Sequence, residues 1–150
     1  MRDWRLPWDG GCRCGKVRFR VSEAPFVTVA CHCRGCQRMT ASAFSLSVAV
    51  PVAGFAVTEG ETELGGLHGA QRHHFCGWCK SWLFTRMEGI DWFVNVRATA
   101  LDEPGWFVPF VETCTAEKLA WAGTPAVHSY PGFPPETDWP RLVEEFAGLD

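Results

Sequence analysis

The sequence predicts a mostly β protein with one short helix near its C-terminus. Two observations predict this fold class. Apolar and polar residues alternate in several short segments, which is the pattern of half-buried strands. Turn-forming pairs such as Gly10-Gly11, Gly65-Gly66 and Pro104-Gly105 recur along the chain and leave pieces that are too short for long helices. We therefore expect a sheet of short strands.

The first predicted strands lie in the N-terminal third of the chain. The segment 16–21 has basic residues on one face and apolar residues on the other: Val17, Phe19 and Val21. In the segment 44–50, Ser45 and Ser47 are expected to face solvent. The opposite, core-facing side of that segment is apolar: Phe44, Leu46, Val48 and Val50. Both segments are expected to be half-buried strands.

Further strands and one helix are predicted towards the C-terminus. A short run around Phe55 and Val57 and the apolar, aromatic-rich segments 82–87, 90–96 and 110–114 favour strands, because each is brief and bounded by turn residues. The segment 138–147 favours a helix, with Asp138 at its N-cap and Pro140 in its first turn. One face of that helix is apolar and is expected to pack against the sheet: Leu142, Val143 and Phe146.

Length and charge narrow the classes of function. A chain of 150 residues, 47% of them hydrophobic, predicts a single domain over 1–150. A net charge of -3 and a pI near 5.9 argue against nucleic acid or an anionic membrane as the main partner. Residues 1–8 contain no apolar run, so we expect no signal peptide, no membrane span and a cytoplasmic location. The sequence does not indicate an oligomeric state.

Eight cysteines are the most unusual feature of the composition. An even number of cysteines also suits a disulfide framework in a secreted protein. Three observations favour metal binding instead: the expected absence of a secretion signal, a chain larger than the small secreted scaffolds, and Cys-x-Cys pairs whose bridging would be strained. We therefore expect metal sites, and two zinc ions per chain.

The first predicted zinc site joins two cysteine pairs that lie far apart in the sequence. Cys12 and Cys14 are alternate residues of an extended segment, so both can face one ion when flanking glycines let the backbone curl inward. Cys76 and Cys79 have the spacing of a zinc knuckle. Four thiolates complete a tetrahedral shell, which predicts a closed, structural site. Nearby basic residues either offset the thiolate charge or simply lie on solvated strand faces: Arg13, Lys16, Arg72 and Lys80.

The second predicted zinc site contains three cysteines within six residues. Cys31 and Cys33 share a face while His32 points away, and Gly35 permits the turn that returns Cys36 to the ion. No fourth ligand is present locally. Three protein ligands and a free position are typical of a catalytic zinc, so we expect this site to be open.

Two alternatives remain for the residues around this cluster. A fourth ligand from elsewhere in the chain would close the site, and the candidates are Cys114, His73, His74 and His128. Cys114 also suits a small buried apolar residue. His32 suits a hydrogen bond behind the ligands, a proton-transfer role or simple exposure.

The expected chemistry of the open site is thiol chemistry. Three thiolates make zinc a weaker Lewis acid than three imidazoles do, so hydrolysis is not the first expectation. Such an ion accepts a further soft ligand and deprotonates a coordinating thiol. We therefore expect capture of a small thiol and bond formation between its sulfur and an electrophilic carbon.

Three motifs resemble the glutathione-dependent formaldehyde-activating enzyme family, which includes centromere protein V. They are Gly-x-Cys-x-Cys-Gly at 10–15, Cys-His-Cys-x-x-Cys at 31–36 and Phe-Cys-x-x-Cys at 75–79, and the stretches 94–102, 117–121 and 128–130 are similar too. The resemblance implies a β-tent fold of short antiparallel strands around zinc sites. It implies a structural zinc and a catalytic zinc on the following ligands: Cys12, Cys14, Cys76 and Cys79 for the first, and Cys31, Cys33 and Cys36 for the second.

The activity that the resemblance implies is that of a carbon-sulfur lyase, which condenses glutathione with formaldehyde to S-hydroxymethylglutathione. Two positions depart from the family pattern. Lys80 stands where the family usually has glycine, and Thr40-Ala41-Ser42 replaces a more glycine-rich turn. We expect a zinc-dependent enzyme that joins a small, glutathione-like thiol to formaldehyde or another small aldehyde, or runs the reverse reaction.

Two other functions are consistent with parts of the sequence. A non-catalytic zinc module that binds another macromolecule is the main alternative. Methionine sulfoxide reduction would need a catalytic cysteine outside the metal ligands, and Cys114 has no activating arginine or resolving partner near it in the sequence.

Overall fold

The computed structural model describes residues 2–149, and these form two compact units. The first unit contains Phe26–Ser47 and 107–149, together with residues 2 and 3. The second contains Trp4–Pro25 and Val48–Trp106. Each unit holds one complete cysteine cluster. The single domain expected over 1–150 stays a prediction.

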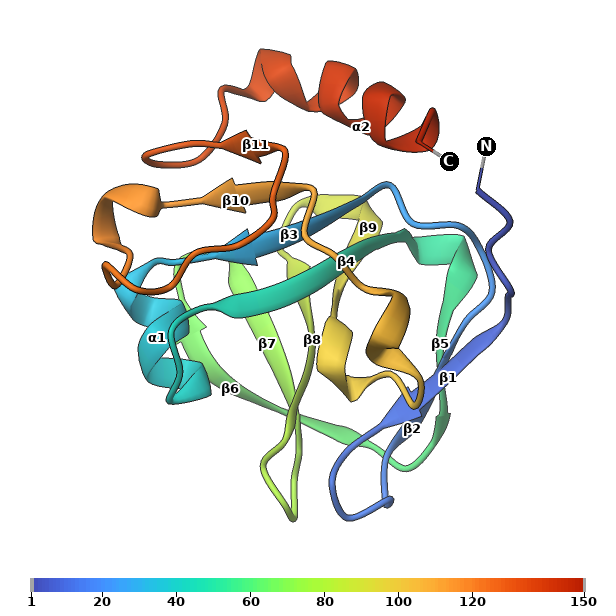
Figure 1. Ribbon diagram of the computed structural model, residues 1–150. Helices are drawn as coiled ribbons and strands as arrows, with labels where there is room; N and C mark the ends of the chain where they lie inside the picture. The colour runs from blue at the N-terminus through green and yellow to red at the C-terminus, as the bar shows by residue number, and fades with distance from the viewer. Residues whose placement is uncertain (1, 150) are drawn as a thin grey trace. The chain divides into compact units, whose positions relative to one another are not determined.

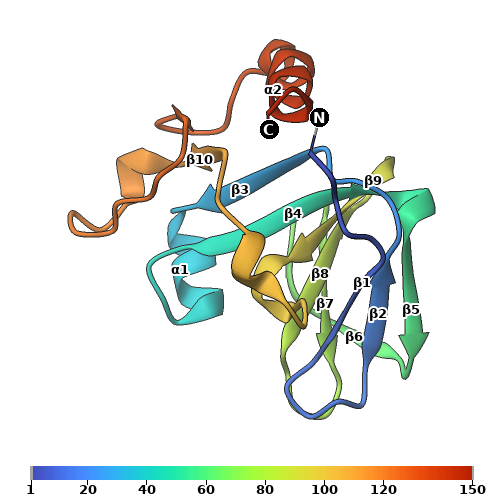
Figure 2. The same cartoon turned by 45° about the vertical axis from the view of Figure 1, so that its right-hand side comes forward.

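The second unit contains a three-stranded antiparallel sheet in the order β1-β2-β5 (Figure 2). Its strands are β1 (Trp8–Gly11), β2 (Arg18–Val21) and β5 (Phe55–Glu59). The side chains of Val17, Phe19 and Val21 are buried, as their alternation with basic residues predicts. Phe55 is buried as well and its ring packs against Phe19, whereas Val57 is exposed. Only the start of β5 therefore contributes to the core.

Four more strands of the second unit form an antiparallel meander, in which each strand pairs with the next one along the chain. They are β6 (Thr62–His68), β7 (Gln71–Cys76), β8 (Trp82–Met87) and β9 (Ile90–Arg97). Leu83, Phe84, Val94 and Val96 are buried and supply its core. The strands predicted at 82–87 and 90–96 are therefore confirmed.

The first unit contains three parallel strands, unlike the antiparallel pairing that was expected throughout. In the order β3-β10-β11, these are β3 (Val27–Cys31), β10 (Val111–Thr113) and β11 (His128–Ser129). Helix α2 (Trp139–Ala147) lies over β3 (Figure 1) and buries Leu142 and Phe146. The predicted mostly β fold with a short C-terminal helix is confirmed.

The start of α2 differs in one detail from the prediction. Asp138 precedes the helix as expected, but its side chain makes no capping hydrogen bond. Its backbone is already helical because it ends a short 3-10 turn, and a capping side chain needs an extended residue. The Asp138 carboxylate instead accepts a hydrogen bond of 3.0 Å from the Tyr130 hydroxyl.

Among the described residues, no helix is long and apolar enough to cross a membrane.

Short helical segments connect these elements. One α-helix, α1 (Arg34–Thr40), lies in the first unit and had not been predicted. The described residues also form five 3-10 turns: η1 (Val52–Gly54), η2 (Ala98–Ala100), η3 (Pro104–Trp106), η4 (Thr115–Glu117) and η5 (Glu136–Asp138).

In strand β4 (Ser45–Pro51), the first residues bury the side that was predicted to face solvent. Ser45 and Ser47 were expected to face solvent, but they are only 4% and 8% exposed, whereas Phe44 and Leu46 are half-buried. Alternation alone assigns the apolar face to the core. For Ser45 the prediction was wrong because its hydroxyl has a partner on this face, the sulfur of the half-buried Cys36.

Candidate metal centres

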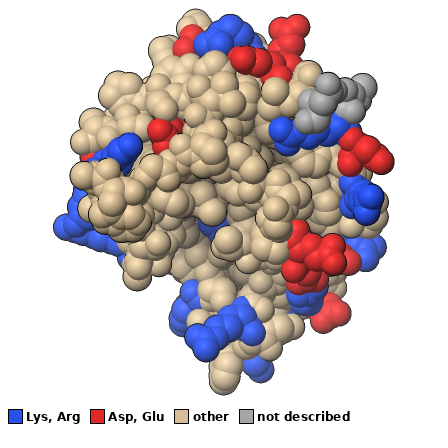
Figure 3. All heavy atoms as spheres, viewed as in Figure 1, with Lys and Arg blue, Asp and Glu red and all other residues tan. Residues whose placement is uncertain are grey.

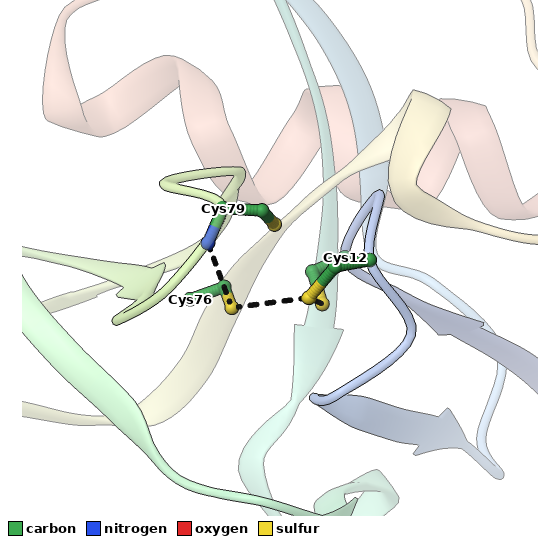
Figure 4. Close-up of side chains that lie close together, drawn as sticks. Cys12, Cys76 and Cys79 are labelled. Carbon is green, nitrogen blue, oxygen red and sulfur yellow. Dashed lines mark hydrogen bonds between the residues drawn. The ribbon is translucent and has the colours of Figure 1, made fainter.

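The second unit brings together the four cysteines that were predicted to form the closed site. Cys12 and Cys14 follow β1, while Cys76 ends β7 and Cys79 lies in the turn before β8. Figure 4 shows the side chains of Cys12, Cys76 and Cys79 pointing towards one another. All four sulfurs lie within 4.8 Å of one another. A single ion at their centre would therefore tie the β1–β2 loop to the β7–β8 turn.

The spacing of these sulfurs fits a metal and not a disulfide. The Sγ atoms of Cys12 and Cys14 are 3.4 Å apart, and those of Cys14 and Cys76 are 3.7 Å apart. Sulfurs bound to a tetrahedral zinc at about 2.3 Å lie roughly 3.8 Å from each other, whereas a disulfide needs about 2.05 Å. All eight cysteines lie in the described part of the chain, and all eight are free thiols.

Glycines shape the loop that carries Cys12 and Cys14, as the sequence predicts. A Cβ atom at Gly11 would lie 2.4 Å from the carbonyl oxygen of Val17, so only glycine fits there. Gly15 has a φ of +82°, which a residue with a side chain rarely adopts. The Cys12 amide donates to Val17 O across this turn, and the Val17 amide donates to the Cys12 sulfur. The turn thereby fixes the direction of the Cys12 side chain.

Lys80 occupies a left-handed position directly after Cys79. Its φ is 60°, which explains why glycine suits this position in the family pattern. Its ammonium group pairs with Glu63, while Arg72 pairs with Glu88 and Lys16 lies over the ring of Trp78. Three of the four basic residues considered for offsetting the thiolate charge therefore have other partners.

The first unit brings together the three cysteines of the predicted open site. Cys31 ends β3, and Cys33 and Cys36 belong to the N-terminal turn of α1. The Cys33 sulfur is the N-cap group, because it accepts a hydrogen bond of 3.3 Å from the Cys36 amide. The three sulfurs lie within 4.8 Å of one another, and all three residues are half-buried. Each of the three residues thus keeps part of its surface exposed to solvent.

The turn that brings Cys36 back to the cluster is helical. Gly35 was expected to permit this turn through its conformational freedom, but it lies inside α1 without a left-handed φ. The i to i+3 spacing of Cys33 and Cys36 places both on one side of a helical turn, so no glycine is needed. A left-handed residue occurs instead at the end of α1, where Ala41 has a φ of 51°. This is the second position that departs from the family's glycine-rich pattern.

Electrostatics show that these three thiols do not ionise together unaided. The hydrogen bond from Cys36 is the largest cause that lowers the pKa of Cys31 to about 5. The same bond, together with burial, raises the pKa of Cys36 far above its ordinary value, and burial also raises the pKa of Cys33. Ionisation of one thiol in the cluster therefore opposes ionisation of the other two. A cation is needed for all three to become thiolates, which fits a metal ion.

The histidines considered as a fourth ligand have other partners. The Nδ1 atoms of His73 and His74 lie 2.8 Å from the hydroxyl oxygens of Thr85 and Thr62, and both histidines belong to the second unit. His128 Nε2 lies 2.9 Å from a Glu145 carboxylate oxygen. None of the three belongs to a group of metal-ligating side chains in the part of the chain that the structure describes.

Cys114 lies beside the open cluster but not in it. It is 5% exposed and has a φ of 57°. Burial, then the negative charge of Cys31, raises the pKa of the Cys114 thiol to about 12. Its sulfur is not part of the group whose atoms all lie within 4.8 Å. A thiol held in its protonated form is a poor nucleophile, which argues against methionine sulfoxide reduction at this residue.

A buried polar network lies behind the open cluster. His32 is fully buried, and its Nε2 lies 2.9 Å from a carboxylate oxygen of Glu112. Glu112 also accepts hydrogen bonds of 2.7 Å from Thr124 and Ser129. Of the alternatives for His32, the structure shows a hydrogen bond behind the ligands. Sequence reasoning missed Glu112, although a charged residue within the apolar segment 110–114 was a signal for it.

Replacing Glu112 with glutamine is expected to destabilise the protein by about 1–3 kcal/mol at pH 7, because an amide cannot accept all three hydrogen bonds. Burial alone would raise the pKa of Glu112, but the bonds from Thr124, Ser129 and His32 lower it below its ordinary value. The carboxylate therefore stabilises the fold above pH 4.5, and this contribution is lost as the pH falls through the lowered pKa.

Urea unfolding of both proteins at several pH values measures this effect. The difference in stability should be constant near neutral pH and shrink in acid. Glu144→Gln on the exposed face of α2 is the matched control and should change little at any pH. A difference that grows in acid would contradict the assignment.

Comparison with known proteins agrees with the cysteine pattern. Residues 7–117 match the family described as glutathione-dependent formaldehyde-activating enzyme. A crystal structure of a Rhodobacter sphaeroides protein is similar in fold, with a TM-score of 0.52 and 21% identity over 63% of this chain and 87% of that chain. A comparison with curated proteins gave no match. The family match includes both cysteine clusters, and the chain belongs to the glutathione-dependent formaldehyde-activating enzyme family.

Proposed function

We propose that this protein is a zinc enzyme of the carbon-sulfur lyase class, which joins a small thiol such as glutathione to formaldehyde or another small aldehyde, or runs the reverse reaction. The observation that carries this proposal is the contrast between the two cysteine clusters. One offers four sulfurs and the other offers three half-buried sulfurs within 4.8 Å of one another. Family membership supports the choice of thiol and aldehyde.

The four-cysteine cluster is proposed to hold a structural zinc. Cys12 and Cys76 are buried, and backbone amides donate to their sulfurs from Val17 and Cys79. Four thiolates fill the coordination shell of zinc, so an ion here has no position left for a substrate. Its contribution is to the stability of the fold.

The three-cysteine cluster is proposed to hold the catalytic zinc. Zinc here would supply a soft Lewis acid that lowers the pKa of an incoming fourth thiol. Cys31, Cys33 and Cys36 hold the site in place, and their partial exposure admits a small molecule. In the reaction, the substrate thiol loses its proton, its sulfur bonds to the carbonyl carbon, and the carbonyl oxygen gains a proton. The reverse reaction breaks the same carbon-sulfur bond.

Surface charge and cysteine chemistry support the remaining proposals about partners and location. On the face shown in Figure 3, the described basic and acidic side chains form small separate groups and not a continuous basic field. Because the net charge of the whole chain is -3, a nucleic-acid partner is not proposed. Thiol clusters of this kind need a reducing compartment, which supports the cytoplasm.

Cobalt substitution tests the proposed function. We expect glutathione to change the visible spectrum of one of the two bound cobalt ions, because only one cluster can accept a fourth thiol. S-methylglutathione, which has no free thiol, should leave the spectrum unchanged. The variant Cys114→Ala should respond to glutathione like the wild type.

Activity is measured as formation of the thiol–formaldehyde adduct. Because thiols add to formaldehyde without a catalyst, the rate with protein must exceed the rate measured without it. A spectrum that no small thiol changes would overturn the proposal and favour a non-catalytic module that binds another macromolecule.

A further inference from the structure

The first residue of β4, Ser45, places its hydroxyl group against the three-cysteine cluster. Ser45 and Ser47 are buried although alternation predicts the opposite face for the core. A hydroxyl that is taken out of water loses free energy unless it finds a hydrogen-bond partner. For Ser45 this partner is a metal-ligand candidate, because its Oγ lies 3.0 Å from the Sγ of Cys36. The reversed facing of the strand therefore places a donor against the cluster.

The direction of this hydrogen bond follows from the chemistry of a thiolate. A thiolate sulfur has no proton, so the Ser45 hydroxyl must donate and the Cys36 sulfur must accept. A donated hydrogen bond draws negative charge away from the sulfur and restricts the rotation of its side chain. Both effects act on the metal through Cys36, because donors behind a ligand orient it and set how much charge it gives to the ion.

The four-cysteine cluster contains a related but weaker arrangement. There the Oγ of Ser81 lies 3.2 Å from the Sγ of Cys79, and Ser81 itself is only half-buried. A hydrogen bond strengthens as water is excluded from it. The Ser45–Cys36 bond is both shorter and more buried, so its effect on the ion should be larger.

We propose that Ser45 is a positioning residue of the open zinc site, whose hydroxyl orients Cys36 and reduces the charge that Cys36 donates to the ion. This inference rests on the proposed assignment of zinc to that cluster. An ion that receives less negative charge from its ligands keeps more positive charge, and it therefore attracts an incoming thiol more strongly. Ser45 thereby favours binding of the substrate thiol without touching it.

The test uses Ser45→Ala, which removes the hydroxyl, and Ser45→Thr, which keeps it. Ser47→Ala is the matched control, because Ser47 is a buried serine of the same strand. Each protein is loaded with cobalt, and the sulfur-to-cobalt charge-transfer band is recorded before any thiol is added. We expect the band of Ser45→Ala to move to lower energy, because its Cys36 sulfur is richer in charge, while Ser45→Thr and Ser47→Ala keep the wild-type band.

Thiol binding is the second measurement. Glutathione should bind cobalt-loaded Ser45→Ala roughly 10-fold more weakly than the wild type, at the lower end of the 10–100-fold losses in metal affinity or activity that follow removal of a partner behind a ligand. An unchanged band in Ser45→Ala, or an equal shift in Ser47→Ala, would overturn the inference. The band reports on the metal without any substrate. If the band of Ser45→Ala shifts but the wild type does not respond to glutathione, the proposed function is wrong and the role of Ser45 still holds.

Discussion

The free energy of unfolding of the variant Cys76→Ala should be several kcal/mol lower than that of the wild type. The variant should also bind one metal ion per chain instead of two. Cys76 is 1% exposed and its sulfur lies 3.7 Å from that of Cys14. Without it the ion loses one of four ligands, and zinc binding in such sites is coupled to folding. The loss is a large share of the ~5–15 kcal/mol that stabilises a typical domain.

Urea unfolding and a metal count per chain measure these two effects. Cys114→Ala is the control, because it also removes a buried sulfur but belongs to neither cluster. That variant should keep two ions and lose far less stability, about 1 kcal/mol from the missing sulfur. If Cys76→Ala melted like the wild type, the four-cysteine cluster would not be a structural clamp.

The variant Cys36→Ala should lose the proposed activity while keeping most of its stability. With only Cys31 and Cys33 left, the open cluster can no longer hold an ion firmly, and the cobalt spectrum should no longer respond to glutathione. We expect kcat/KM to fall roughly 100-fold or more, which corresponds to about 2.7 kcal/mol of transition-state stabilisation.

Adduct formation, corrected for the uncatalysed rate, gives this value for each variant. Stability should change less than in Cys76→Ala, because the four-cysteine cluster in the second unit stays intact. A Cys36→Ala protein as active as the wild type would place the reaction somewhere other than the three-cysteine cluster.

The strands and the cysteine clusters could be predicted because each depends on residues that are close in sequence. Alternation is a local pattern, and it gave the correct buried face for Val17, Phe19 and Val21. Glycine neighbours indicated the tight loop of Cys12 and Cys14, and a steric requirement at Gly11 explains why. The structure brings both cysteine sets together, although their occupation by zinc stays a prediction.

Three of the features that sequence reasoning missed depend on partners outside the local segment. Ser45 is buried because of Cys36, and alternation carries no information about such a bond. Glu112 is tolerated inside the unit because His32, 80 residues away in sequence, and two hydroxyl groups meet it there. The parallel pairing of β3 with β10 likewise joins segments that are about as far apart, and no local pattern specifies it.

The left-handed residues near the cysteines have a consequence for how the protein responds to metal supply. Among the described residues other than glycine, positive φ angles occur at Ala41, Lys80 and Cys114. Lys80 follows Cys79, Cys114 lies beside the open cluster, and Ala41 ends the helix that carries Cys36; each costs roughly 1–2 kcal/mol of backbone strain. In the proposed zinc-loaded protein, the binding energy of the ions would offset this strain. If zinc occupies the clusters as proposed, the metal-free protein should therefore be softer and more sensitive to proteases than the loaded protein.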